Sequence, residues 1–435
     1  MGKGQILYQK AKKLIPGGTQ LLSKRPEQFL PDYWPSYYSK AKGCYVWDLD
    51  EKKYIDMSYM GIGSCVLGYS DDDVNNAVIQ TIQDGNMSTL NVPEEVELAE
   101  LMLKIHPWAN MVRYARGGGE AMAIAIRIAR AATKKDIVLF CGYHGWHDWY
   151  LSANLADDKA LDGQLLPGLS PIGVPRQLKG TSFPFSYNNA DQFIELFNKY
   201  KENIGAIVVE AIRNIYPQDN FFSTIQEIAN KNNIPIIVDE VSSGFRINSG
   251  GAHLVLGLNP DIAVFAKAVS NGYPMGIIIG KSKYMDVAQD TFISSTYWTE
   301  RIGPVAALAT VNKIIKENVP KHLVSCGEQV QNGWRSLALK NNIDIEVGGI
   351  YPLSHFNFKE QHLLSKTLYT QEMLKMGFLA TNAFYASFAH KQEHIDQYLE
   401  ATDIAFKKIH EAQKNNNFEK YLDGPVCQSG FRRLT

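Results

Sequence analysis

The chain has 435 residues, of which 45% are hydrophobic and 20% charged, and its formal net charge is −1. This length suggests two or three domains' worth of core, and the near-neutral charge argues against nucleic acid or an anionic membrane as a partner. No apolar run reaches the length of a membrane helix, and the polar N-terminus is unlike a signal peptide. The five cysteines show no metal-ligand spacing, so we expect reduced thiols in a cytoplasmic protein.

The first hundred residues predict helices around one hairpin. Residues 6–14 predict a short basic helix that a Pro-Gly-Gly turn ends. Residues 43–50 and 53–57 predict two strands across a polar turn. Residues 73–83 and 94–105 predict amphipathic helices, and the second has glutamates in its first turn, where the helix dipole favours them.

A glycine run separates the next strand from a long helix. Residues 111–115 predict the strand, and the alanine-rich residues 122–132 predict the helix. Gly117, Gly118 and Gly119 lie between them. Free N–H groups at the positive end of a helix dipole make an anion cradle, so this segment predicts a phosphate-binding turn. A plain tight turn between strand and helix explains the glycines equally well.

The following segment combines a buried strand with a polar loop. Residues 137–140 predict a parallel strand that ends on the run GYHGWHD at residues 142–148. Its histidines and aspartate resemble metal ligands, but no second ligand set accompanies them, so we expect no metal site. Residues 157–189 predict a long loop rich in Pro and Gly. Such a loop is either part of a substrate entrance or an excursion over the surface or a dimer interface.

Two apolar runs, residues 205–211 and 234–240, end in carboxylates. Their composition is typical of strands buried on both faces of a parallel sheet, and apolar residues at helical spacing separate them. A βαβ unit is the natural interpretation. Ligands in open α/β sheets bind at the carboxyl ends of the strands, which is where Glu210 and Asp239 lie.

A third apolar run, residues 262–266, leads directly into Lys267. The connection to the next run, residues 276–280, is too short for a parallel crossover, so the two should be antiparallel. Burial lowers an ammonium pKa and makes Lys267 a candidate for a Schiff base with an aldehyde, although a core lysine paired with a carboxylate is the simpler alternative. Together with Asp239 it supplies the two groups that pyridoxal phosphate (PLP) requires.

The run VDEVSSGFR at residues 238–246, followed by Lys267, resembles the class III (ω-) aminotransferases of PLP fold type I, and within them the glutamate-1-semialdehyde-aminomutase-like subgroup. The resemblance implies an aspartate-aminotransferase-like α/β fold. Its central sheet would be mostly parallel with one antiparallel strand, and a smaller α+β domain would come from both termini. Residues 1–60 and 311–435 would form that smaller domain, and residues 61–310 the PLP-binding domain.

The resemblance also implies roles for single residues. Lys267 would hold PLP and move protons, Asp239 would stabilise the protonated pyridine nitrogen, and Tyr143 would stack on the ring. Thr299 would reach the phosphate in the partner's site of a homodimer. The remaining cofactor contacts would come from Gly117, Gly118, Gly119, His144, Glu210 and Ser242, and a substrate carboxylate would bind Lys24, Arg25 or Arg213.

The chain departs from the family's pattern at three places. Three glycines stand where a hydroxyl residue usually contacts the phosphate, and Ser242 stands where many class III enzymes carry a glutamine near the cofactor's phenolic oxygen. Tyr297 and Trp298 replace the glycine-rich gating loop of the aminomutase. The last two differences argue against an enzyme that must trap a diamine intermediate.

The resemblance predicts transamination from L-glutamate, giving 2-oxoglutarate, to a small carbonyl acceptor. A keto-sugar such as 8-keto-3-deoxy-octulosonate, in surface polysaccharide (lipopolysaccharide) biosynthesis, is the expected acceptor. A glutamate-1-semialdehyde 2,1-aminomutase or an amino-acid racemase of the same fold is the alternative. A non-catalytic PLP-fold binding or regulatory protein is a distant third.

Overall fold

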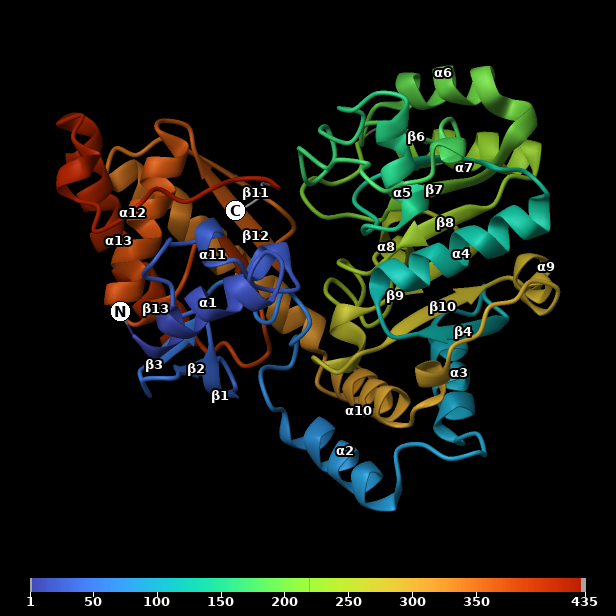
Figure 1. The fold of residues 1–435 in the computed structure, drawn as a ribbon, viewed down its shortest axis with the longest axis horizontal. Coiled ribbons are helices and arrows are strands. Elements are labelled where there is room, and N and C mark those ends of the chain that lie inside the picture. Colours follow the sequence, from blue (N-terminus) through green and yellow to red (C-terminus); the bar gives the residue numbers. More distant parts are fainter. Residues whose placement is uncertain (1, 219, 432–435) are drawn as a thin grey trace. The chain divides into compact units, whose positions relative to one another are not determined.

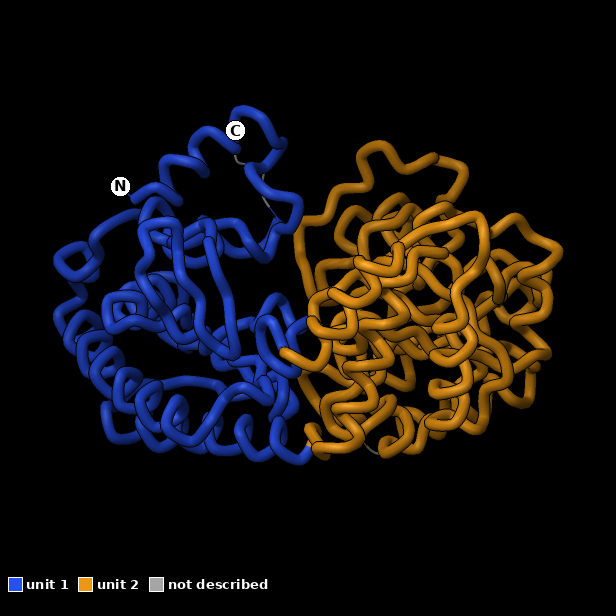
Figure 2. The backbone as a smooth tube through the Cα atoms, turned by 90° about the horizontal axis from the view of Figure 1, so that it is seen from below, with its two compact units in different colours: residues 1–71, 321–435 blue, residues 72–320 orange. Residues whose placement is uncertain are grey.

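The computed structural model describes residues 2–218 and 220–431, which fall into two compact units (Figures 1 and 2). One unit comprises residues 72–320, and the other combines residues 1–71 with residues 321–435. Among the helices of the described residues, none is both long and apolar enough to cross a membrane.

The larger unit is built on a seven-stranded sheet in which one strand, β10, runs antiparallel to both neighbours. The other pairings are parallel. This confirms the predicted fold class. Across the sheet the strands are β4 (Met111–Ala115), β10 (Gly276–Gly280), β9 (Ile262–Phe265), β8 (Ile236–Asp239), β7 (Ile204–Glu210), β5 (Ile137–Cys141) and β6 (Ser182–Pro184).

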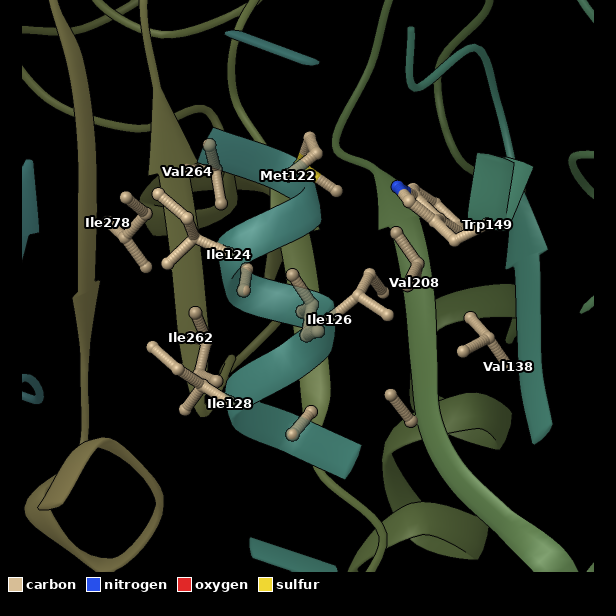
Figure 3. Packing of buried hydrophobic residues seen from close by; sticks show 14 of the residues in the cluster. Met122, Ile124, Ile126, Ile128, Val138, Trp149, Val208, Ile262, Val264 and Ile278 are labelled. Carbon is tan, nitrogen blue, oxygen red and sulfur yellow. The ribbon is translucent and has the colours of Figure 1, made fainter. Parts of the chain in front are cut away.

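The central strands are apolar apart from the carboxylates that end β7 and β8, because both faces of the sheet are covered. Every residue of β5, β7, β8, β9 and β10 is buried. Helix α4 (Gly118–Thr133) packs across one face: Figure 3 shows Ile124 and Ile128 beside Val264 and Ile262 of β9. The unit's other main helices are α2 (Asp72–Asp84), α3 (Glu94–Ile105), α6 (Ala190–Tyr200), α7 (Phe221–Asn232) and α10 (Ile302–Lys316).

Two local predictions in this unit were wrong. Residues 182–184, expected within the long loop, form the edge strand β6, which pairs in parallel with β5. Pro184 is compatible with a sheet edge because no further strand needs the N–H that proline lacks. The strand was missed because three residues are too few to show a periodic pattern. Gly118 and Gly119, expected to precede the helix, form its first turn.

The smaller unit contains two small sheets, with strand orders β1-β2-β3-β13 and β11-β12-β14. Strands β2 (Tyr45–Asp48) and β3 (Lys53–Asp56) form the predicted antiparallel hairpin. β13 (Phe378–Leu379) pairs in parallel with β3, so the N-terminal and C-terminal segments of this unit share one sheet. The remaining elements are β1 (Tyr38–Lys42), β11 (Ile345–Gly348), β12 (Leu353–Phe358), β14 (Ala383–Tyr385), α1 (Lys3–Leu14), α12 (His362–Lys375), α13 (Gln392–Lys414) and most of α11 (Val319–Lys340).

Candidate active site

Chemically reactive side chains gather at the carboxyl edge of the large sheet. β7 ends at Glu210 and β8 at Asp239, and the register pairs these two residues directly. β9 ends two residues before Lys267. Because the three strands are parallel, their carboxyl ends lie at the same edge, which is where α/β sheets bind ligands.

Lys267 has a strained backbone. It begins a 3-10 turn, Lys267–Ser270, with a φ of +51°. A non-glycine residue rarely adopts this left-handed conformation, and such strain concentrates at functional sites. The amine donates a hydrogen bond to Ser242 Oγ, 2.8 Å away.

The surroundings of Lys267 favour its neutral form. Burial first, and then the nearby cations Arg213 and Arg246, lower the pKa of the amine to about 7, while Glu210 and Asp239 oppose the shift. A large share of the amines is therefore unprotonated near neutral pH. A neutral buried amine can attack an aldehyde and can accept a proton.

Asp239 is held in a fixed orientation by its neighbours. Its Oδ2 lies 2.7 Å from His144 Nδ1, and its Oδ1 accepts from the N–H of Val241 at 2.9 Å. The second ring nitrogen of His144 lies 3.1 Å from the carbonyl oxygen of Cys141, so both nitrogens face acceptors and the ring is fixed. The carboxylate is buried and oriented, as a partner for a ring N–H must be.

Glu210, Arg213 and Ser242 form a chain of contacts beside the lysine. Arg213 Nη2 lies 2.5 Å from Glu210 Oε1 and donates to Ser242 Oγ at 2.8 Å. Burial raises the pKa of Glu210, and the charge of Arg213 counteracts that effect. The hydroxyl of Ser242 thus links this ion pair to Lys267.

Tyr143 lies on the loop after β5, close to the same cluster. Its N–H donates to Glu210 Oε2 at 3.4 Å, and the Arg213 guanidinium carbon lies 6.0 Å from its ring centre. The ring meets Tyr150 edge-on. Burial raises the pKa of the Tyr143 phenol, so the ring stays uncharged and can pack against another aromatic system.

The N-terminus of α4 has room for an anion. Gly117 is the N-cap residue and provides no side-chain cap, and a Cβ added to it would meet nothing within 4 Å. Gly118 is tightly packed, because its Cβ would lie 2.8 Å from Val241 Cγ1. Open space therefore borders the start of this helix at Gly117, and the dipole favours a negative group there.

These features fit PLP. A partly neutral buried lysine suits its aldehyde, a fixed carboxylate suits its pyridine nitrogen, and an uncapped helix start with free space suits its phosphate.

A small cavity of about 160 Å³ opens beside this cluster. Gln164, from the long loop, contributes to its wall, and the Gln164 side chain accepts from the N–H of Gly142 at 2.7 Å. Other lining residues include Tyr143, Tyr187, Glu210, Arg213 and Asn214.

The remaining predicted site residues belong to other parts of the chain. Thr299 ends the exposed turn Thr296–Thr299, where its Oγ1 donates to the carbonyl of Thr296 at 2.9 Å. Lys24 and Arg25 belong to the smaller unit, where the Arg25 guanidinium lies 5.8 Å from the ring of Phe431.

Sequence reasoning missed two contributors. Arg246 is almost fully buried, and its Nε donates to the backbone oxygen of Ser242 at 2.5 Å. An arginine within the buried run VDEVSSGFR was a usable signal, because a buried charge needs partners. Gln164 gave no signal, since nothing in a polar loop distinguishes one glutamine from another.

The fold and this cluster define a PLP-dependent enzyme of fold type I. Residues 31–402 match the family "Aminotransferase class-III", and the chain belongs to that family. It is a class III PLP-dependent aminotransferase. The family's chemistry is transamination, in which an amino donor reacts with a carbonyl acceptor, or the related aminomutase reaction.

Among curated proteins, the glutamate-1-semialdehyde 2,1-aminomutase of Nitrosopumilus maritimus is 35% identical, with 93% of this chain and 98% of that protein covered. The 3-aminobutyryl-CoA aminotransferase of Cloacimonas acidaminovorans is 27% identical, with 94% of this chain and 96% of that protein covered. Among solved structures, the FumI protein of Sphingopyxis sp. MTA144 superposes with a TM-score of 0.86 at 23% identity, covering 95% of this chain and 98% of that one.

Proposed function

We propose that this enzyme transfers an amino group from an amino acid donor, L-glutamate, to a carbonyl of a small hydroxylated acid. A keto-sugar such as 8-keto-3-deoxy-octulosonate, in cytoplasmic steps of surface polysaccharide synthesis, is the acceptor that we favour. The observation that carries the residue assignment is the convergence of Lys267 and Asp239 at one sheet edge, each oriented by its own partner.

When bound, PLP supplies a ring that accepts electrons from a bond broken next to nitrogen. Lys267 would bind its aldehyde carbon, and the first N–H groups of α4, at Gly117 to Gly119, would hold its phosphate. Asp239, oriented by His144, would hold a proton at the pyridine nitrogen. Tyr143 would pack on the ring face.

Lys267 also has the properties of a proton carrier. Once the substrate's nitrogen has taken its place, its neutral amine can accept the proton from the carbon that bears the amino group. The same amine, now charged, can return that proton to the neighbouring cofactor carbon. A pKa of about 7 suits both directions, since neither form is strongly favoured.

The cavity supports a hydroxylated acceptor. Its wall presents amide and phenol groups of Gln164, Asn214 and Tyr143 beside the charged Arg213. Such groups can donate to and accept from sugar hydroxyls. Lys24 and Arg25 are further candidates for the acceptor's carboxylate.

We also propose a homodimer in which Thr299 reaches the phosphate of the partner's site. Thr299 is exposed in the single chain, next to Tyr297, whose exposed fraction is 73%. Phe292, a few residues upstream, is also strongly exposed. Large exposed apolar side chains in one segment are typical of a surface that a partner covers.

An aminomutase is the second candidate, because several relatives that align along most of the chain carry that name. We favour the aminotransferase because Tyr297 and Trp298 occupy a short exposed turn rather than a glycine-rich gate. The half-reaction with glutamate separates the candidates. With glutamate, an aminotransferase bleaches the visible band of bound PLP and releases one equivalent of 2-oxoglutarate, which a mutase does not.

The test of the proposal is a screen of keto-sugars and amino donors, with products identified by mass spectrometry. Release of 2-oxoglutarate together with an aminated sugar acid supports it. Rapid conversion of glutamate-1-semialdehyde without any keto acid overturns it in favour of the mutase.

A further inference from the structure

Arg213 places a permanent cation beside the amine of Lys267, and Ser242 connects the two. Ser242 Oγ lies 2.8 Å from Lys267 Nζ and 2.8 Å from Arg213 Nη2. A guanidinium can only donate, so Arg213 occupies a lone pair of this oxygen. The same oxygen also accepts a hydrogen bond from the Lys267 amine, so it joins the two groups.

Arg213 is held at this point before any ligand arrives. Its partner Glu210 lies three residues earlier in the chain, and the side chains of the pair are only 12% and 8% exposed. Breaking a buried ion pair leaves an uncompensated charge, which is costly. A guanidinium fixed in this way is suited to a permanent partner rather than to a substrate that enters and leaves.

The proposed binding mode of PLP, on which this inference rests, determines what Arg213 would face. The ring carbon that carries the aldehyde has two neighbours, one bearing the phenolic oxygen and one bearing the phosphate arm. The atoms nearest to Gly118 and Gly119 at the α4 N-terminus belong to Val241, Ala266, Gly145 and His147, whereas Arg213 follows β7 and contacts Glu210 and Ser242. A phosphate held at α4 would leave the phenolic oxygen as the group that Arg213 and Ser242 meet.

We propose that Arg213, anchored by Glu210 and aligned through Ser242, contacts the phenolic oxygen of bound PLP and stabilises its ionised form. This assignment takes the place of the substrate-carboxylate role that the sequence suggested for Arg213. It also gives Ser242 a function: a short side chain leaves space for a guanidinium that comes from the neighbouring strand. The cofactor would then be paired with a full positive charge at this oxygen rather than with a neutral amide.

The test is a pH titration of the visible absorption of the purified holoenzyme, with no substrate present. Removing Arg213 alone would leave Glu210 as an unpaired buried carboxylate, so the comparison is made between Glu210→Gln and the double variant Glu210→Gln/Arg213→Met. The apparent pKa of the bound chromophore should be higher in the double variant by about one unit or more, a tenfold change in proton affinity. Arg127→Met, which removes an exposed arginine of α4, is the control and should leave this pKa unchanged.

Other charged or titratable groups surround the same point: Lys267 after β9, Asp239 and Arg246 around β8, Glu210 on β7, and Tyr143 and His144 after β5. They are the same in the two variants compared, so the difference between the variants isolates Arg213.

An unchanged chromophore pKa in the double variant, with a raised KM for acidic substrates alone, overturns the inference and makes Arg213 a substrate residue. An equal shift in Arg127→Met also overturns it, because the effect would then be one of net charge. Failure of the proposed PLP-binding mode is distinguishable from either result, because borohydride would then attach no label to Lys267 of the wild-type protein. Failure of the proposed acceptor would leave the visible band and the label in place and would appear only in the screen of keto-sugars.

Discussion

Asp239 and Glu240 are adjacent buried carboxylates with different surroundings. Asp239 faces the cluster that contains Lys267 and is oriented by His144. Glu240 is fully buried and accepts from His253 N–H and Ser243 Oγ, with His253 Nδ1 2.8 Å from the same carboxylate. Asp239 is the last residue of β8 and Glu240 directly follows it, and successive residues of an extended chain point to opposite faces. One carboxylate can therefore serve the site while the next binds groups of the core.

The network around Glu240 extends away from the proposed site. Trp108 donates to His253 Nε2 at 3.1 Å, and the ring of His106 stacks on that of His253. Burial lowers the pKa of His106 to about 4, so this ring stays neutral. Groups of the protein itself satisfy the Glu240 carboxylate, so we assign it a structural role. Substitution of each carboxylate tests this difference from Asp239.

The largest expected effect is at the lysine. Lys267→Ala should abolish transamination, because the amine that binds PLP and moves the proton is lost. Borohydride reduction followed by peptide mapping should place the pyridoxyl label on Lys267 in the wild-type protein and nowhere in the variant. Full turnover by Lys267→Ala would exclude the assignment.

The two carboxylates should respond in opposite ways. Asp239→Asn should lower kcat by about 10²- to 10⁴-fold with little change in melting temperature, since it removes the charge that holds the ring proton. Glu240→Gln should cost roughly 3 kcal/mol of unfolding free energy, because a buried paired charge is lost, and should leave kcat per folded molecule close to normal. Kinetics and denaturant titrations of both variants measure this. The reverse pattern would mean that the roles are exchanged.

The two glycines at the start of α4 make a smaller contrast. Gly118→Ala should destabilise the fold by about 1–3 kcal/mol, because its Cβ would lie 2.8 Å from Val241 Cγ1. Gly117→Ala meets no atom within 4 Å, so it should leave stability nearly unchanged and weaken PLP binding by filling the anion space. Thermal unfolding of the apo-protein and PLP titration separate the two effects. Equal PLP affinity in Gly117→Ala and wild type would place the phosphate elsewhere.

The last contrast concerns the pH dependence of the apo-protein. The folded-state pKa of Lys267, about 7, lies below its ordinary value of 10.5, so the unfolded chain binds more protons between these limits. Stability should therefore rise with pH from about 7 to about 10, by at most about 1.4 kcal/mol per pH unit from this group. Denaturant titrations of wild type and Lys267→Met across this range should differ by that slope. Parallel curves would show that the amine is charged in the folded state.

The sequence alone determined most strands of the large sheet, its mainly parallel character and the carboxylates that end β7 and β8. Continuous apolar runs indicated strands buried on both faces, and the short turn after Lys267 required the antiparallel β10. Helix α3 was predicted with the bounds that the structure has. These features depend on local composition and chain connectivity, so a single sequence contains them. The edge strand β6 escaped because three residues carry no period.

Only the tertiary structure decided which side chains meet. Ser242 joins Lys267 to Arg213 across three strand ends, and His144 reaches Asp239 over 95 positions of sequence. The lowered pKa of Lys267 has the same origin, since it depends on burial and on cations brought close by folding. Residue types and spacing specify what each strand end carries, whereas packing sets the distances on which hydrogen bonds and charge interactions depend.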